Sequence, residues 1–175
     1  MEWIELGKLI KIRKGNKLEE VENTSNSIRM IMIEDLRSDM NYKYTKIDKK
    51  NVIVNENDIV IAWDGANAGT IGFNLKGAIG STLARLSIQT DNISAKYLGN
   101  FLRSRFKEIR DNCTGATIPH VSRAHLNSIN VPVPPIEIQE KIVKVLDQAQ
   151  TLIDKRKEQI EALDQLIESI FYTMF

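Results

Sequence analysis

The feature that most constrains the fold is the last part of the chain, which contains neither glycine nor proline from Ile136 to Met174. Three prolines between residues 132 and 135 precede it. Because proline removes an amide donor and biases the preceding residue away from helix, these prolines mark a domain boundary. We therefore expect one domain over residues 1–135 and one long helix over residues 136–175, roughly 58 Å in length at about 1.5 Å per residue.

Within this helix, two ladders of residues recur at intervals of seven, which is typical of the a and d positions of a coiled coil. So long an apolar stripe cannot be buried along its whole length against the preceding domain, so most of it must meet another helix. Arg156 is the exception in the stripe: it either fixes the register by pairing or extends to the edge of the seam. The expected dimerisation residues are Ile142, Leu146, Ala149, Ile153, Arg156, Ile160, Leu163, Ile167, Ile170 and Met174.

The first 92 residues predict short strands separated by turns, with little helical periodicity. A strand over residues 3–12 ends at a breaker over residues 13–16. A glycine-rich stretch over residues 64–72 predicts a further turn, because glycine permits positive φ. The remaining expected strands are residues 27–33, 52–54, 59–62 and 84–88. Together they indicate a curled, loop-rich β domain.

One helix is expected to pack on this sheet. Ser94 is a candidate N-cap, and apolar residues recur at helical spacing from there through Arg110, which predicts about four turns. The other face of this helix carries Arg103, Arg105 and Lys107 together with Arg110. These cations form either an ordinary solvated face or a wall beside a DNA backbone.

Composition narrows the functional class. Apolar residues make up 42% and charged residues 27%, which excludes a disordered tail, and no run of about 18 apolar residues could span a bilayer. The N-terminus lacks the order of a signal peptide, and Cys113 is the single cysteine, so a cytoplasmic setting is expected. The net charge is only +1, yet residues 76–135 hold eight Lys and Arg against three Asp and Glu. Such a local excess favours a surface that follows phosphates.

No motif for catalysis is evident. The stretch from Gly65 to Gly72 matches neither a phosphate-binding loop nor a dinucleotide-binding loop. Cys113, His120 and His125 have no standard zinc spacing, and Cys113 with His120 lacks an identifiable orienting partner. We therefore expect no catalytic residue, no metal site and no cofactor on this chain, and we expect it to bind rather than catalyse.

The segment from Thr114 to Ile142 carries a resemblance to a known family. It contains Thr114–Ser122 with its Gly-Ala-Thr turn, then Val131–Pro135 with its Pro-x-Pro-Pro ending, then Gln139-Glu140 at the helix start. This order resembles the signature of type I restriction-modification specificity subunits, although Ile138 stands where an acid is commoner. The opening, with Trp3, Leu6-Gly7 and Gly15, and the Asn57–Ile61 strand with Gly65 and Gly69 are similar to the family as well.

The resemblance implies an α+β fold: a loop-rich curled β target-recognition domain with packed helices, followed by one long C-terminal coiled-coil helix. It also implies a sequence-specific DNA recognition subunit that reads a half-site in the major groove of double-stranded DNA. Modification (methyltransferase) subunits would bind S-adenosylmethionine, and a restriction subunit would use ATP and Mg²⁺. The family commonly has two recognition domains, so this chain is expected to be a natural half-subunit or a fragment. If the chain stands alone, its heptad seam predicts that two copies pair, antiparallel, as a homodimer.

The recognition loops are the expected places of DNA contact, since loops diverge on a shared scaffold. Trp63 is equally compatible with a core position. The candidate DNA-binding residues are Lys14, Asn16, Lys17, Trp63, Asn67, Ser81, Thr82, Arg85, Thr117, His120, Ser122 and Arg123.

Two alternatives stay open at this point. In the first, the chain is a scaffold that recruits a methyltransferase and binds DNA without sequence preference, with a salt-dependent affinity equal for all sequences. In the second, it is the recognition portion of a fused restriction enzyme.

Overall fold

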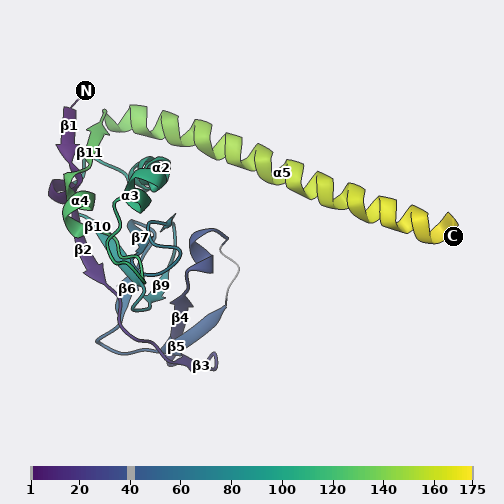
Figure 1. Ribbon diagram of the computed structural model, residues 1–175, viewed down its shortest axis with the longest axis horizontal. Helices are drawn as coiled ribbons and strands as arrows, with labels where there is room; N and C mark the ends of the chain where they lie inside the picture. Colours follow the sequence, from purple (N-terminus) through teal and green to yellow (C-terminus); the bar gives the residue numbers. More distant parts are fainter. Residues whose placement is uncertain (1, 39–41, 175) are drawn as a thin grey trace. The chain divides into compact units, whose positions relative to one another are not determined.

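The computed structural model describes residues 2–38 and 42–174. It forms two compact units, residues 1–139 and residues 140–175, and the first holds all the strands of the described part (Figure 1). The strands are β1 Glu2–Glu5, β2 Ile10–Lys14, β3 Glu20–Val21, β4 Ser27–Ile31, β5 Lys43–Lys46, β6 Val52–Val54, β7 Asp58–Ala62, β8 Ile71–Phe73, β9 Gly77–Ile79, β10 Leu83–Ile88 and β11 Asn130–Val133. The helices are α1 Leu6–Leu9, the short 3-10 helix η1 Glu34–Leu36, α2 Ala95–Ser104, α3 Phe106–Asp111, α4 Arg123–Ser128 and α5 Ile136–Met174.

The strands form three sheets. A four-stranded antiparallel sheet has the order β2-β10-β7-β8, and a five-stranded sheet has the order β3-β5-β4-β9-β6 with one parallel pair, β4 with β9. The third sheet pairs only β1 with β11. The expected α+β class with a long C-terminal helix is confirmed, as are the strands predicted around residues 27–33, 52–54, 59–62 and 84–88.

The two larger sheets share one hydrophobic core. Alternate residues of a strand point to opposite faces, so β10 sends Leu83 into this core and turns Ala84 and Leu86 to the other face. On that other face α2 contacts β7 and β8. The shared core consists of Ile31, Leu36, Val52, Val54, Val60, Ala62, Leu75, Ile79 and Leu83.

The prediction of one strand over residues 3–12 was wrong in its middle. Leu6 and Leu9 lie three residues apart and are both buried, at 0% and 2% exposure, on the short helix α1. This spacing places both side chains on one side of a helical turn, and α1 contacts α4, whose Leu126 is fully buried. The chain therefore makes β1, a helical turn and β2 instead of one strand.

The helix predicted from Ser94 to Arg110 is two helices. Ser94 does cap the first, since its hydroxyl accepts the Tyr97 amide at 3.2 Å, but the backbone leaves the helical region at Arg105 (φ −94°, ψ 9°). With this break, α3 buries Ile109 at 1% exposure and directs Arg110 toward the glycine turn after β7.

Two arginines of the expected outward face contact the neighbouring strand and turn. Arg103 donates to the Ile71 carbonyl at 3.1 Å and stacks over the Phe73 ring at 4.2 Å. Burial lowers the pKa of Arg103 from its ordinary value. Arg110 donates to backbone carbonyls of the glycine turn. As whole residues, Arg103, Arg105 and Lys107 remain exposed, and Arg110 is partly buried.

The pairing of β1 with β11 brings together the two ends of the β domain. β1 and β11 lie side by side (Figure 1). Glu2 is opposite Val133 and Glu5 is opposite Asn130, in an antiparallel register. The segment with the Pro-x-Pro-Pro ending thus begins within strand β11, which includes Pro132. The Pro132 carbonyl also accepts the Tyr97 hydroxyl at 2.9 Å, which ties β11 to α2.

The second unit is the continuation of α5, a helix of 39 residues whose described part runs without interruption to Met174. From Lys144 onward every described residue of it is exposed. Among residues 2–38 and 42–174, no helix has both the length and the apolar character needed to cross a membrane.

Candidate nucleic-acid interface

Three loops converge beside the end of β7. The Trp63 amide donates to the Thr82 carbonyl at 2.8 Å, which joins the turn after β7 to the loop before β10. The Val121 amide donates to the Trp63 carbonyl and the Gly65 amide to the Pro119 carbonyl, both at 2.9 Å. These bonds fasten the loop before α4 across the glycine turn. Backbone pairing thus gathers loops that are far apart in sequence.

The loop before α4 is closed on itself by Thr114 and His120, whose backbone amides and carbonyls exchange two hydrogen bonds of 2.8 and 2.7 Å. Gly115 makes this closure possible, with a φ of +97°. A Cβ at this position would lie 2.3 Å from the Ile118 carbonyl oxygen and 3.0 Å from Cδ2 of His120. The Gly-Ala-Thr motif therefore has a steric cause: its glycine allows the loop to fold over the His120 ring.

Asp64 lies at the centre of the converging loops and contacts two of the predicted site residues. Its carboxylate accepts Lys14 Nζ at 2.5 Å and His120 Nδ1 at 2.6 Å. The Asp64 side chain is 15% exposed, whereas those of Lys14 and His120 are 44% and 48% exposed. Burial raises the pKa of Asp64, but the hydrogen bonds from Lys14 and His120 and the positive charge of Lys14 outweigh it, so the pKa lies below its usual range.

Arg123 and Trp63 form the neighbouring part of the surface. Trp63 is 9% exposed, in keeping with the core position that its residue type also allowed, and the Arg123 guanidinium lies over its ring at 5.5 Å. Arg123 itself is exposed. Ser122 caps α4 by accepting the His125 amide at 3.3 Å, so its hydroxyl has a structural role.

Arg110 supports the glycine turn from behind. Its Nη1 donates to the carbonyls of Gly65 and Ala68, both at 3.3 Å. Sequence reasoning placed this arginine on an outer face and missed Asp64 altogether, because a carboxylate is not expected where a phosphate binds. The signal available was the position of Asp64 directly before the first glycine of the turn.

The other predicted loop residues lie in several places. The Asn16 side chain donates to the Lys50 carbonyl, and Asn67 accepts the Arg37 guanidinium at 2.9 Å. Lys17, Ser81 and Thr82 line a cavity of about 240 Å³. Thr117 is exposed in the loop before α4.

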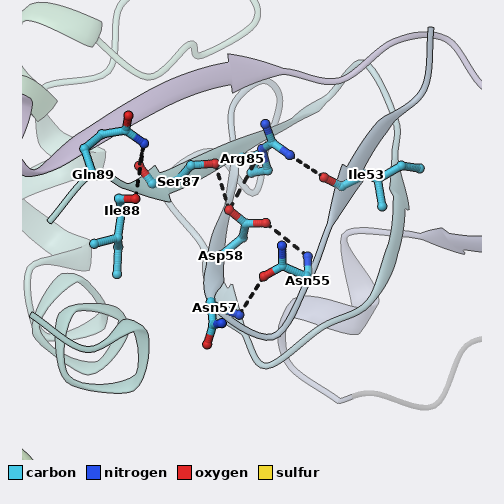
Figure 2. A network of polar contacts seen from close by, with 8 residues as sticks. All are labelled: Ile53, Asn55, Asn57, Asp58, Arg85, Ser87, Ile88 and Gln89. Atoms are coloured by element: carbon cyan, nitrogen blue, oxygen red, sulfur yellow. Dashed lines mark hydrogen bonds and ion pairs between the residues drawn. The ribbon is translucent and has the colours of Figure 1, made fainter. Parts of the chain in front are cut away.

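Arg85 lies apart from the Asp64 cluster. In the β2-β10 register it is opposite Arg13, whereas Lys14 is opposite Ala84, so Arg85 and Lys14 are on opposite faces of the sheet. Its Nη1 donates to the Ile53 carbonyl at 2.6 Å and its Nε lies 4.0 Å from buried Asp58 (Figure 2). Asp58 also accepts the Ser87 hydroxyl at 2.7 Å. The arrangement of Arg85 is that of a link between β10, β7 and β6.

The predicted seam is on the surface of α5. Its large apolar members are between 39% exposed, at Ile142, and 71% exposed, at Met174. Ala149 and Arg156 are exposed as well, and Arg156 donates to Gln159 one turn further along at 2.9 Å.

Gln139, in the first unit, is part of the motif that carries the family resemblance, but the sequence alone did not reveal its role. Its side chain is fully buried and makes three hydrogen bonds to backbone groups.

The chemistry of the remaining candidate ligands is unremarkable. Cys113 donates its thiol to the Ile109 carbonyl at 3.4 Å. Burial raises the pKa of this thiol, and the positive charge of Arg110 offsets the rise only in part. Across residues 2–38 and 42–174, no group of three or more His, Cys, Asp or Glu side chains is placed to hold a metal ion.

Two solved structures share the fold. A chain from a structure of complex assembly and conformational transition of the type I R-M system has a TM-score of 0.68 at 22% identity, over 90% of this chain and 40% of that chain. The HsdS subunit from Thermoanaerobacter tengcongensis has a TM-score of 0.64 at 22% identity, over 90% and 39%.

Sequence relatives agree with this likeness. The type I restriction enzyme MjaVIII specificity subunit of Methanocaldococcus jannaschii is 33% identical over 99% of this chain and 41% of its own length. The EcoBI specificity subunit of Escherichia coli is 22% identical over 87% of this chain and 32% of its own length. The chain therefore spans less than half the length of these relatives. A model of the type I restriction modification DNA specificity domain matches residues 1–163, and the chain belongs to this family.

Proposed function

We propose that this chain is a DNA sequence-recognition unit of a type I restriction-modification complex, and that it reads one half-site through the surface around Asp64. The observation that carries the proposal is the family match over residues 1–163. The relatives are specificity subunits by name, and three loops gather polar and cationic side chains at one place on this chain.

The chemistry of this surface suits DNA. The Lys14 ammonium has three donors and gives one to Asp64, so two are available to phosphate oxygens. Arg123 presents a planar guanidinium held over Trp63, which suits a bidentate contact with phosphate or guanine. Exposed Arg105, between α2 and α3, and exposed Lys107, on α3, can add phosphate contacts.

The assembly follows from the same proposal. α5 pairs with α5 of a second copy, antiparallel, because its heptad seam is apolar and exposed. Modification subunits dock on this assembly and use S-adenosylmethionine, and a restriction subunit uses ATP and Mg²⁺. Catalysis belongs to those partners, so the chain itself needs no cofactor, and the complex works in the cytoplasm.

Arg123→Ala tests the proposed surface. Duplexes selected from a random library by the purified full chain provide the ligand, and fluorescence anisotropy at moderate salt measures affinity. We expect Arg123→Ala to weaken binding about tenfold, since an arginine contact to DNA contributes about 1–3 kcal/mol. Lys144→Ala on α5, which removes the same charge from an exposed position, should leave affinity unchanged.

Two results would count against the proposal. Equal affinity of the wild-type chain for all duplexes would support a scaffold without sequence preference. Unchanged affinity of Arg123→Ala would remove Arg123 from the site.

A further inference from the structure

Asp64 contacts His120 in a way that determines which ring nitrogen carries a hydrogen. The Asp64 carboxylate is ionised at neutral pH, because its pKa is lowered, and an ionised carboxylate can only accept hydrogen bonds. His120 Nδ1 lies 2.6 Å from Asp64 Oδ1. The hydrogen of this bond must therefore be on Nδ1, and in the neutral imidazole Nε2 then carries a lone pair.

The His120 ring is held on more than one side. The backbone exchange with Thr114 fixes the His120 main chain, and Gly115 lies so close that an added Cβ would be 3.0 Å from Cδ2 of the ring. Lys14 shares the same Asp64 carboxylate, which limits movement of Asp64. His120 is thus preorganised in its orientation, a requirement for reading a hydrogen-bond pattern.

Nε2 of the His120 ring is available to contact a DNA base. The His120 side chain is 48% exposed, and within residues 2–38 and 42–174 its Nε2 has no hydrogen-bond partner. In the major groove adenine N6 and cytosine N4 are donors, whereas guanine O6 and N7 and thymine O4 are acceptors. An accepting Nε2 can form a hydrogen bond with the amino group of adenine or cytosine. It cannot form one with guanine O6, guanine N7 or thymine O4, which are acceptors too.

We infer that Asp64 is a positioning residue that fixes His120 as a hydrogen-bond acceptor, and that His120 thereby selects adenine or cytosine at one position of the half-site. This inference rests on the proposed function, because it needs DNA at this surface. Asp64 thereby contributes to base preference without contacting a base itself. The loop before α4 is expected to prefer bases that present an amino group in the major groove.

The first test measures the tautomer without DNA. The chain has only two histidines, so ring ¹⁵N and ¹³C chemical shifts of the full chain in alkaline buffer can be assigned with His125→Gln. We expect the Nδ1–H form for His120 in the wild type and in Asp64→Asn, whose amide oxygen can still accept. Asp64→Ala should shift His120 toward the Nε2–H form. Lys14→Met, which keeps the Asp64–His120 bond, should not; an Nε2–H form in the wild type overturns the positioning role.

The second test measures base preference. Selected duplexes are changed one base pair at a time, and the affinities of wild type, His120→Ala and Asp64→Ala are compared. We expect one position at which the wild type prefers adenine or cytosine about fivefold, the size of one hydrogen bond, and at which both variants lose the preference while Asp64→Asn keeps it. If the variants lose a preference for guanine or thymine, or lose no preference, the inferred readout by His120 is overturned and the proposed function is not. A wild type without any base preference overturns the proposed function as well.

Discussion

Gln139 satisfies three backbone groups with one buried side chain. Its Oε1 accepts the Ser94 amide at 3.0 Å, and its Nε2 donates to the carbonyls of Asn92 and Pro134, both at 2.8 Å. The amide thus joins the start of α2 to the proline segment before α5. The glutamine of the family motif has a structural cause here, and no shorter or charged side chain offers one acceptor and two donors at this reach.

Gln139→Ala should destabilise residues 1–139 strongly. The substitution removes the side-chain partner of one amide and two carbonyls, of which the Pro134 carbonyl is in a buried contact, and we expect a loss of about 3 kcal/mol in the free energy of unfolding. Urea denaturation followed by circular dichroism measures it, with exposed Gln148→Ala as the matched control. A loss below about 1 kcal/mol would show that the three groups find other partners.

At the same scale, the sequence predicted part of the candidate site. Lys14, His120 and Arg123 were predicted where turn formers and cations occur together. The structure places Lys14 at the end of β2, His120 in the loop before α4 and Arg123 at the start of α4, and brings them to one region. Asp64 could not be predicted, because its role depends on two hydrogen-bond partners 50 and 56 positions away in the chain. Arg85 was predicted as a loop residue, but it lies on β10, and the strand register places it on the opposite face from Lys14.

Elements with a regular internal pattern were predictable, and those defined by distant pairing were not. The apolar runs of β4, β6, β7 and β10 and the uninterrupted heptads of α5 are local signals. The short strands β3, β5, β8 and β9 each have four residues or fewer and depend on their neighbours in the sheet. The break at Arg105 likewise serves packing that periodicity does not reveal.

α5 carries its own prediction. Ile153→Glu with Ile160→Glu places two charges in the apolar seam, and we expect the proposed dimer to dissociate because burying unpaired carboxylates is unfavourable. Sedimentation equilibrium should give twice the chain mass of 19.9 kDa for the wild type and the single mass for the variant. Thr151→Glu with Gln165→Glu adds the same charge away from the seam and should remain dimeric; dissociation of this control would point to net charge as the cause.

For the whole molecule, two-fold pairing of the chain predicts the symmetry of the DNA motif that is methylated in cells. A homodimer with one reader at each end recognises two inverted copies of one half-site around an unread spacer. Methylome sequencing of cells that express this chain with its modification subunit should show a palindromic methylated motif. The Ile153→Glu and Ile160→Glu variant should abolish the methylation, and a motif without two-fold symmetry would contradict the homodimer.

The pairing of β1 with β11 has a consequence for how the β domain can be exchanged between proteins. Since Glu2 lies opposite Val133, the β domain starts and finishes on adjacent strands of one ribbon. A module whose two ends are neighbours can be transplanted into another chain at a single place without displacing what precedes or follows it. Recombination between genes that share only the sequence around these two strands would therefore exchange the DNA reader as an intact cassette.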